Sequence, residues 1–352
     1  MNNVLLVSLE FPPSSVASVH RARHMAKCLP MFGWHPVVLT VDERFQKGAT
    51  DYPLAALLPE DLEIIRIPAL PLDTLAKVGI GDISLRAYGY LRAELARLLA
   101  SGRFDVVFMT GCPFYHMTLT GWIRRRFKIP VVLDFQDPWV SHVGGLEPYW
   151  SKAGVTHRLA LLLEPRAVRN AAFITSVSDR QNVELAERYP WLDLRRMAGI
   201  PIGGDPDDFR RIAREAEPTD GEYFTVSFVG TVTPRAIPVH ETVLRALSLV
   251  RRDYPGLAAR LRLRFVGTSN QPDGSAYALS DIVCAEGLAD MVREEPVRVP
   301  FLDALRIVAT SGANLLVGSL EPHYTASKIY PGLMSGRPFL SVFHELSSAH
   351  AI

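Results

Sequence analysis

Two loops in the second half of the chain carry side chains suited to binding a phosphate group. The first is Gly230-Thr231-Val232-Thr233-Pro234-Arg235, which directly follows an apolar run. Gly230 permits a close approach of the backbone, and the Arg235 guanidinium presents a fork of donors that matches phosphate oxygens. The loop therefore indicates a site for a diphosphate leaving group, with an ordinary surface loop as the alternative.

The second loop, residues 318–328, gathers an acid, an imidazole and an ammonium within a short stretch. Glu321, His323, Ser327 and Lys328 lie in it, and a helical pattern begins near Ser327. Amide groups at a helix N-terminus lack partners within the helix and favour an anion. This density of polar groups favours a binding site over a solvated loop.

Acidic groups and a histidine follow apolar runs in the first half of the chain. Asp134 and Asp137 lie three residues apart in the segment 134–139. They belong either to a functional site or to helix caps and loop ties. His116 follows another such run, where an imidazole can hydrogen-bond a sugar hydroxyl or polarise a transition state. The alternative for His116 is a structural role.

The loop from Phe11 to Ser18 precedes a helical pattern and contains Pro13, Ser14 and Ser15. Free amides at the start of that helix would favour a polar or anionic ligand. The alternative is a proline-stiffened turn in which Ser18 caps the helix.

All these loops follow strand-like runs that alternate with helical periodicity. In the first half, strands are predicted at 4–9, 37–41, 62–67, 106–110, 131–135 and 173–177. The alternation restarts with strands at 224–229, 261–266, 314–317 and 338–342. Such alternation is typical of doubly wound parallel sheets, which bind ligands beyond the carboxyl ends of their strands. We therefore expect the polar loops to lie at the ligand-binding edges of two sheets.

The restart of the pattern predicts two domains. A length of 352 residues exceeds the usual size of one hydrophobic core, and glycine and proline gather between Ile200 and Thr219. We expect one domain at residues 1–205, a linker at 206–222 and a second domain at 223–352. Because the chain stops at Ile352 shortly after a predicted strand, we expect the C-terminal domain to be incomplete.

Composition excludes several classes of function. With 38 basic against 37 acidic side chains and 48% hydrophobic residues, the chain is a globular protein without a nucleic-acid-coating surface. Cys28, Cys112 and Cys284 are scattered, so neither a disulfide framework nor a zinc site is predicted. No signal peptide precedes the first strand, and no apolar run approaches the roughly 20 residues that span a bilayer. We expect a cytoplasmic protein whose membrane contact, if any, is peripheral.

Short motifs recur in a fixed order along nearly the whole chain. They comprise Phe11-Pro12-Pro13 with Arg21-Ala22-Arg23, the segment 130–139 ending in Asp134-Phe135-Gln136-Asp137-Pro138-Trp139, Glu164 followed by 174–178, the segment 201–209, Phe228-Val229-Gly230-Thr231, Phe265-Val266-Gly267, and Ser327-Lys328-Ile329-Tyr330 with Gly336-Arg337-Pro338. As an ordered set they resemble the bacterial family 4 glycosyltransferases, with Gln136 where the family usually has arginine.

This resemblance implies an α/β fold of the GT-B type, in which two Rossmann-like domains face a central cleft. It implies transfer of a sugar from a nucleotide-diphosphate donor to a hydroxyl, with retention and without an obligatory metal or another cofactor. The domain at 1–205 would lie on the acceptor side and the domain at 223–352 would hold the donor. The acceptor would be a glycan, a lipid-linked or a small hydroxyl compound, in polysaccharide or surface-glycan assembly at the inner membrane face.

The resemblance also implies roles for the polar residues. Electrostatics must replace a metal at the departing diphosphate. The residues assigned to donor binding are Gly230, Thr231, Arg235, Ser327 and Lys328. The candidate catalytic residues are His116 and Glu321, which would contact the transferred sugar, and Asp137. The acceptor would lie against Pro13, Ser14, Ser15 and Asp134.

Three features depart from the family pattern. Residues 14–18 replace a glycine-rich loop, Pro331 replaces the glutamate of a K-x-x-E segment, and no second basic residue closely follows Arg235. These departures favour, as an alternative, a noncatalytic GT-B protein that binds a glycan or supports a partner transferase. A nucleotide-sugar epimerase is a further alternative, since its chemistry also needs placed carboxylates. A dehydrogenase is disfavoured because no G-x-G-x-x-G follows the first strand.

Overall fold

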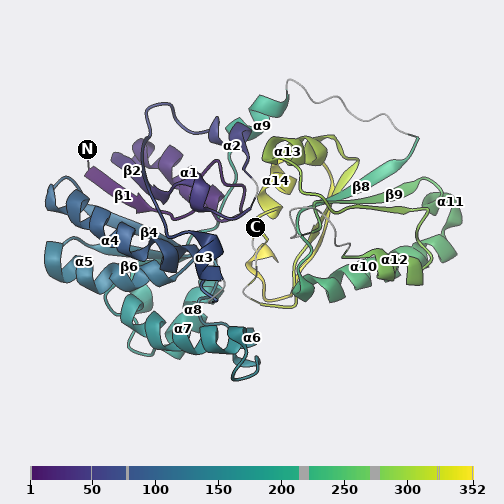
Figure 1. The fold of residues 1–352 in the computed structure, drawn as a ribbon. Helices are drawn as coiled ribbons and strands as arrows, with labels where there is room; N and C mark the ends of the chain where they lie inside the picture. The colour runs from purple at the N-terminus through teal and green to yellow at the C-terminus, as the bar shows by residue number, and fades with distance from the viewer. Residues whose placement is uncertain are drawn as a thin grey trace. The chain divides into compact units, whose positions relative to one another are not determined.

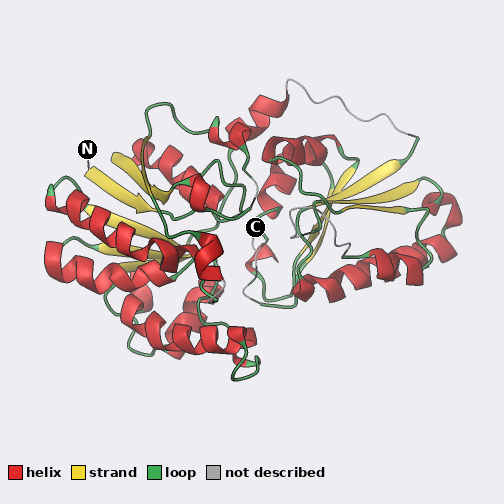
Figure 2. Ribbon diagram, viewed as in Figure 1, coloured by secondary structure: helices red, strands yellow, loops and turns green. Residues whose placement is uncertain are grey.

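The computed structural model describes residues 2–48, 50–76, 79–213, 222–269, 278–322, 324, 326–350 and 352. The chain divides into two compact units, Met1–Ile202 (unit 1) and Gly203–Ile352 (unit 2), each built of helices and one parallel sheet (Figure 1, Figure 2). The sequence places the boundary at residue 205 and a linker at 206–222. In the structure, helix α9 (Pro206–Ala213) occupies the first part of that range, and 214–221 lie outside the described residues.

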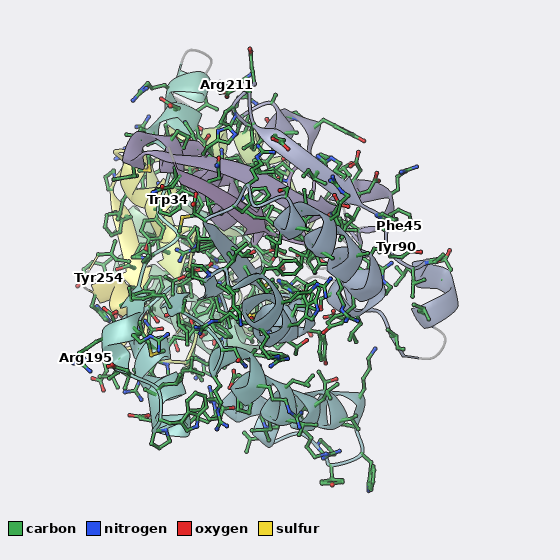
Figure 3. All side chains as sticks on the ribbon, turned by 90° about the vertical axis from the view of Figure 1, so that its left-hand side faces the viewer. Trp34, Phe45, Tyr90, Arg195, Arg211 and Tyr254 are labelled. Carbon is green, nitrogen blue, oxygen red and sulfur yellow. The ribbon has the colours of Figure 1, made fainter. Side chains whose placement is uncertain are left out.

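The sheet of unit 1 has seven strands, all paired in parallel. In spatial order they are β3 (Glu63–Ile67), β2 (Trp34–Val41), β1 (Asn2–Val7), β4 (Val106–Gly111), β5 (Val131–Phe135), β6 (Phe173–Ser176) and β7 (Met197–Gly199). Trp34 is the first residue of β2, and Phe45 lies a few residues after the carboxyl end of that strand. Figure 3 labels both residues. The order reverses between β1 and β4, and doubly wound sheets bind ligands beyond the carboxyl ends of the strands at such a reversal.

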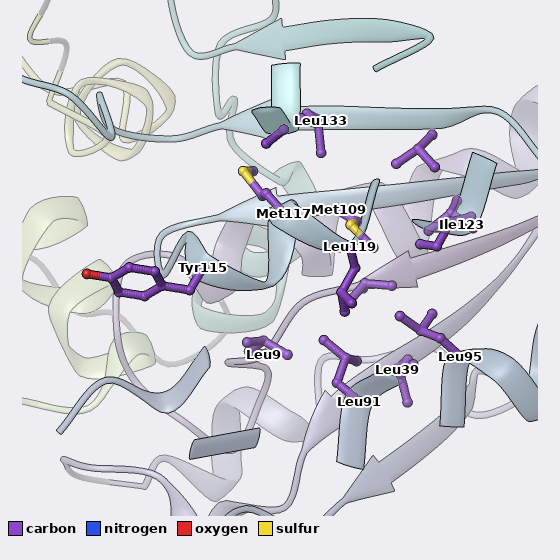
Figure 4. Close-up of a cluster of buried hydrophobic side chains, with 14 of the residues drawn as sticks. Leu9, Leu39, Leu91, Leu95, Met109, Tyr115, Met117, Leu119, Ile123 and Leu133 are labelled. Atoms are coloured by element: carbon purple, nitrogen blue, oxygen red, sulfur yellow. The ribbon is translucent and has the colours of Figure 1, made fainter. Parts of the chain in front are cut away.

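Helices cover both faces of this sheet because its strands are apolar on both sides. The longer ones are α1 (Val19–Cys28), α4 (Ile83–Ala100), α5 (Thr120–Phe127), α7 (Lys152–Val168) and α8 (Asp179–Arg188), and the shorter ones are α2 (Tyr52–Ala55), α3 (Leu72–Ala76) and α6 (His142–Gly145). Successive strand side chains point to opposite faces. Leu5 and Val7 accordingly join one buried cluster with Leu91 of α4, drawn in Figure 4, whereas Leu6 packs with Ala22 of α1 on the other face.

Unit 2 repeats this arrangement with five parallel strands. In spatial order they are β10 (Val292–Glu295), β9 (Leu261–Val266), β8 (Phe224–Val229), β11 (Ala313–Val317) and β12 (Phe339–Val342). Its helices, besides α9, are α10 (Ile237–Asp253), α11 (Pro255–Ala258), α12 (Ser280–Ala285), α13 (Phe301–Thr310) and α14 (Ile329–Met334). Phe228, Leu244, Phe265 and Val317 belong to its core.

The structure confirms the predicted α/β class with two Rossmann-like units, since the central strand order of both sheets is the doubly wound order. Two strands were not predicted from the sequence. The strand β7 has three residues, and β10 is a polar edge strand of the sequence Val-Arg-Glu-Glu, so neither gives an apolar run. Among the described residues, no helix combines the length and the apolar character needed to cross a bilayer.

Candidate functional site

The strand order of unit 2 reverses between β8 and β11, and the loops after both strands carry the polar residues singled out in the sequence. Gly230 follows β8 directly and has φ +136°, a conformation that L side chains rarely adopt. Glu321 and Lys328 belong to the loop between β11 and α14. Ligands of doubly wound sheets bind at such a reversal. We call Gly230, Arg235, Glu321 and Lys328 the β8/β11 site.

Lys328 lies against the backbone of Gly230 within this site. A Cβ added to Gly230 would lie 3.3 Å from Lys328 Nζ, and the ammonium lies 3.8 Å from the centroid of the Phe228 ring. The ring offers a cation–π contact, but the ammonium forms no hydrogen bond or ion pair with another described residue. Burial lowers the pKa of Lys328 to about 7. Lys328 is thus a cation without an anionic partner in the part of the chain that the structure describes.

Arg235 and Glu321 form the second part of the site. Arg235 Nη1 donates to both carboxylate oxygens of Glu321, at 2.9 and 3.1 Å, and the Arg235 side chain is half exposed. A guanidinium has five N–H donors, and only Nη1 is engaged with another described residue. Nε and Nη2 of Arg235 thus have donors to offer to a ligand.

The other two residues predicted to bind the donor, Thr231 and Ser327, are sequence neighbours of this site. Thr231 is half-buried and follows Gly230, and Ser327 is half-buried and precedes Lys328. The helix expected near Ser327 begins at Ile329 and has six residues, so it contributes only a weak dipole. His323 lies outside the described residues.

Two residues that lie next to the β8/β11 site, Phe228 and His240, were not predicted from the sequence. Phe228, the penultimate residue of β8, contacts Lys328 with its face and the ring of His240 at 4.8 Å between centroids. His240 Nδ1 lies 2.8 Å from the Ala236 carbonyl oxygen, and burial lowers the pKa of His240 to about 4. A neutral imidazole at this position adds no second positive charge next to Lys328.

In unit 1, the structure corrects the expectation that Asp134 faces an acceptor. Its carboxylate is fully buried and is held by Arg21, with Nη2 to Oδ1 at 2.5 Å and Nε to Oδ2 at 3.1 Å, while Thr175 Oγ1 donates to Oδ1 at 2.6 Å. Arg21 also donates to the carbonyl oxygens of Ile200 and Pro201. Asp134 and Arg21 therefore tie α1, β5 and the end of unit 1 together.

The loop from Phe11 to Ser18 is partly closed to a ligand. Pro13 and Ser14 are buried, and the Pro13 carbonyl oxygen accepts from the Asp51 amide at 2.6 Å, whereas Ser15 is half-buried. Ser18 is the N-cap residue of α1, as the alternative expects, but its Oγ donates to Glu10 at 2.9 Å and makes no capping hydrogen bond. Burial raises the pKa of the Glu10 carboxyl.

The two predicted catalytic residues of unit 1 differ in their access to solvent. His116 is fully buried in the turn after β4, and burial lowers its pKa to about 4, so its ring is neutral and touches no solvent. Asp137 is exposed beyond the carboxyl end of β5. Within the described part of the chain, no three His, Cys, Asp or Glu side chains gather to hold a metal ion.

Residues 18–203 match the family described as "Glycosyl transferase 4-like domain", and no curated protein matches the chain. The structure resembles a glycosyltransferase from Rickettsia africae ESF-5, with 14% identity, coverage of 97% of this chain and 79% of that chain, and a TM-score of 0.56.

Two further solved structures resemble the chain more closely in fold. The alpha,alpha-trehalose-phosphate synthase (UDP-forming) from Burkholderia vietnamiensis has 14% identity, coverage of 100% and 86%, and a TM-score of 0.66. The E. coli "Trehalose-6-phosphate" bound with UDP-2-fluoro glucose has 11% identity, coverage of 99% and 86%, and a TM-score of 0.65. At these identities the likeness concerns the fold, and it confirms the expected GT-B class.

Proposed function

The chain belongs to the glycosyl transferase 4-like family and is a glycosyltransferase, and we propose that it takes its sugar from a nucleotide-diphosphate donor held by unit 2. Two of the structures similar in fold support this choice of donor, because one contains UDP-2-fluoro glucose and the other is named as UDP-forming. The acceptor is proposed to be a hydroxyl of a glycan, a lipid-linked or a small compound in surface-glycan assembly.

The observation that carries the proposal is the Lys328 ammonium. It lies next to Gly230 where the strand order of unit 2 reverses, without an anionic partner among the described residues. A partly buried charge without a partner is costly, and a phosphate oxygen supplies the missing opposite charge. A diphosphate lying along the Gly230 backbone would therefore gain more from this site than an uncharged ligand of the same size.

The proposed chemistry follows from the same two cations. During transfer, the bond between the anomeric carbon and the terminal phosphate oxygen breaks, and negative charge grows on that oxygen. The Lys328 ammonium and the Nε and Nη2 donors of Arg235 would stabilise this charge, while Glu321 fixes the guanidinium through Nη1. Fixed cations can do this without a metal. We propose metal-independent transfer with retention of the anomeric configuration.

The acceptor side is proposed to lie in unit 1. Ser15 and Asp137 are its two predicted residues that reach solvent, whereas Pro13, Ser14 and Asp134 are buried. Asp137 remains the proposed catalytic group of this unit, and a sugar contact by His116 remains a prediction. Glu321 is proposed to contact the transferred sugar as well as Arg235.

The proposal is tested by calorimetric titration of the whole chain with UDP, GDP, ADP, TDP and the corresponding nucleosides, in EDTA and in magnesium. We expect one diphosphate to bind equally well in both conditions. Lys328→Met should weaken the binding of that diphosphate much more than the binding of its nucleoside. Arg252→Met is the matched control, since it removes one positive charge from an exposed part of α10. Absence of binding to all diphosphates would replace the proposal by the noncatalytic alternative.

A further inference from the structure

Helices α5 and α7 of unit 1 lie side by side (Figure 1). A pocket of about 530 Å³ opens between them. Three arginines line it, Arg125 of α5 and Arg166 and Arg169 at the end of α7, together with Leu161 and Leu162. Pockets that hold small ligands or head groups usually have volumes of about 300–1,000 Å³. The pocket is thus large enough for a phosphate-bearing group.

None of these three guanidinium groups is paired with a carboxylate in the described part of the chain. Arg166 Nη1 donates to the Leu162 carbonyl oxygen at 3.2 Å, and Arg169 lies 4.8 Å from the centroid of the Trp191 ring. The Arg125 side chain has no hydrogen bond, ion pair or ring contact with another described residue. Many other arginines of this protein have an acidic partner, as Arg103 has in Glu63 at 2.5 Å. The pocket therefore carries positive charge that no acidic side chain among the described residues neutralises.

The solvent side of α7 next to this pocket is apolar. Val155, Leu159 and Leu162 are 47%, 37% and 52% exposed, and their spacing of four and three residues places them on one stripe that ends at Arg166. Exposed helix faces normally carry polar groups. A continuous apolar stripe of this kind marks an interaction surface.

Large apolar side chains continue this surface beyond the start of α7. Leu146, Tyr149 and Trp150 are 73%, 61% and 84% exposed, and the Arg158 guanidinium lies 3.3 Å from the centroid of the Tyr149 ring. Aromatic and aliphatic groups next to unpaired basic groups are the composition of elements that lie in a membrane interface. We use the name α5–α7 surface for residues 146–169, which comprise the loop before α7, α7 itself and Arg169, together with Arg125 of α5.

We propose that the α5–α7 surface docks onto an anionic lipid bilayer and holds a phosphate-bearing lipid head group between Arg125, Arg166 and Arg169. Guanidinium groups bind phosphate oxygens through paired donors, which accounts for the unpaired arginines. The leucines and Trp150 would enter the boundary between head groups and acyl chains. A soluble anion would account for the arginines but would leave the apolar stripe in water.

Vesicle co-sedimentation of the whole chain tests this docking. Vesicles of phosphatidylcholine with about a third phosphatidylglycerol should bind the protein at low ionic strength, and pure phosphatidylcholine vesicles should not. Changing Arg125, Arg166 and Arg169 together to Gln should weaken binding on the order of 100-fold, from roughly fivefold for each arginine. Leu162→Ser should weaken it roughly three- to tenfold.

Matched controls come from unit 2. Leu249→Ser changes a leucine of α10 that is 51% exposed, and Arg252→Gln removes an exposed arginine, so both should leave vesicle binding unchanged. Wild-type affinity of the triple-arginine variant, equal losses in the controls, or no binding to anionic vesicles would overturn the proposal. Direct binding of glycerol phosphate that depends on the three arginines, with no binding to anionic vesicles, would overturn it in favour of a soluble-anion pocket. Vesicle binding is measured without donor or acceptor, so its outcome is separate from that of the proposed transfer.

Discussion

Lys328 should make diphosphate binding depend on pH above neutrality. Burial lowers the pKa of this ammonium from 10.5 to about 7 in the free protein, and a bound diphosphate favours the charged form. The ligand therefore binds the protonated state, so affinity is nearly complete at pH 6 and is lost as the pH rises through this pKa. The protonated fraction falls from about nine-tenths at pH 6 to about 3% at pH 8.5, which lowers affinity roughly 30-fold.

The assay is calorimetric titration with UDP, or with whichever diphosphate binds, from pH 6 to pH 8.5 in buffers of different ionisation enthalpy. At pH 8.5 the wild-type protein should take up about one proton per bound ligand. Lys328→Arg keeps its charge throughout this range and should bind with little dependence on pH beyond the ionisation of the ligand itself. An equal pH slope in the two proteins, or no proton uptake by the wild type at pH 8.5, would refute the assignment of Lys328 to the diphosphate.

Three substitutions test the other assignments. Arg235→Ala should weaken diphosphate binding roughly 10- to 100-fold and spare the nucleoside, and equal losses in the two titrations would exclude a phosphate contact. Asp134→Asn should lower the free energy of unfolding in urea by about 3 kcal/mol because it leaves Arg21 buried without its carboxylate. An unchanged unfolding midpoint would show that Asp134 has no structural role. Asp137→Asn should leave donor affinity and melting temperature unchanged and slow transfer, so unaltered turnover would remove Asp137 from the mechanism.

Much of the fold could be predicted because buried parallel strands give short continuous apolar runs. The strands that flank both reversals, β1, β4, β8 and β11, are of this kind and were all expected. The strands β7 and β10 lie at sheet edges, where one side of the strand has no neighbour. Their short or polar sequences carry no signal, and only packing against the adjacent strand reveals them.

The position of the candidate site could be predicted from the sequence, but the ion pairs between its side chains could not. Loops after strands could be recognised, and they include Gly230 and Lys328. That Arg235 binds Glu321 could not be deduced, because the two residues are 86 positions apart. The role of Asp134 depends in the same way on Arg21, 113 positions away. An aspartate at the end of a strand has the same local pattern whether it faces a ligand or a buried guanidinium.

The α5–α7 surface gave no clear signal in the sequence. A net charge of +1 conceals a local excess of arginine, and basic residues near helix C-termini are usual because they complement the helix dipole. The exposed leucines of α7 have the spacing of an ordinary core-facing stripe. Only the structure shows that this stripe points to solvent, while Ala160, Glu164 and Ala167 form the buried side of the helix.

The central claim is that unit 2 holds the diphosphate of the donor at the β8/β11 site. Hydrogen–deuterium exchange of the whole chain, with and without the diphosphate that binds, tests it most directly. The account predicts slower exchange in peptides covering 228–235 and 318–322 and in the segment around Lys328, with no such protection in Lys328→Met at the same ligand concentration. Protection confined to the strand ends of unit 1, or unchanged by that substitution, would contradict it.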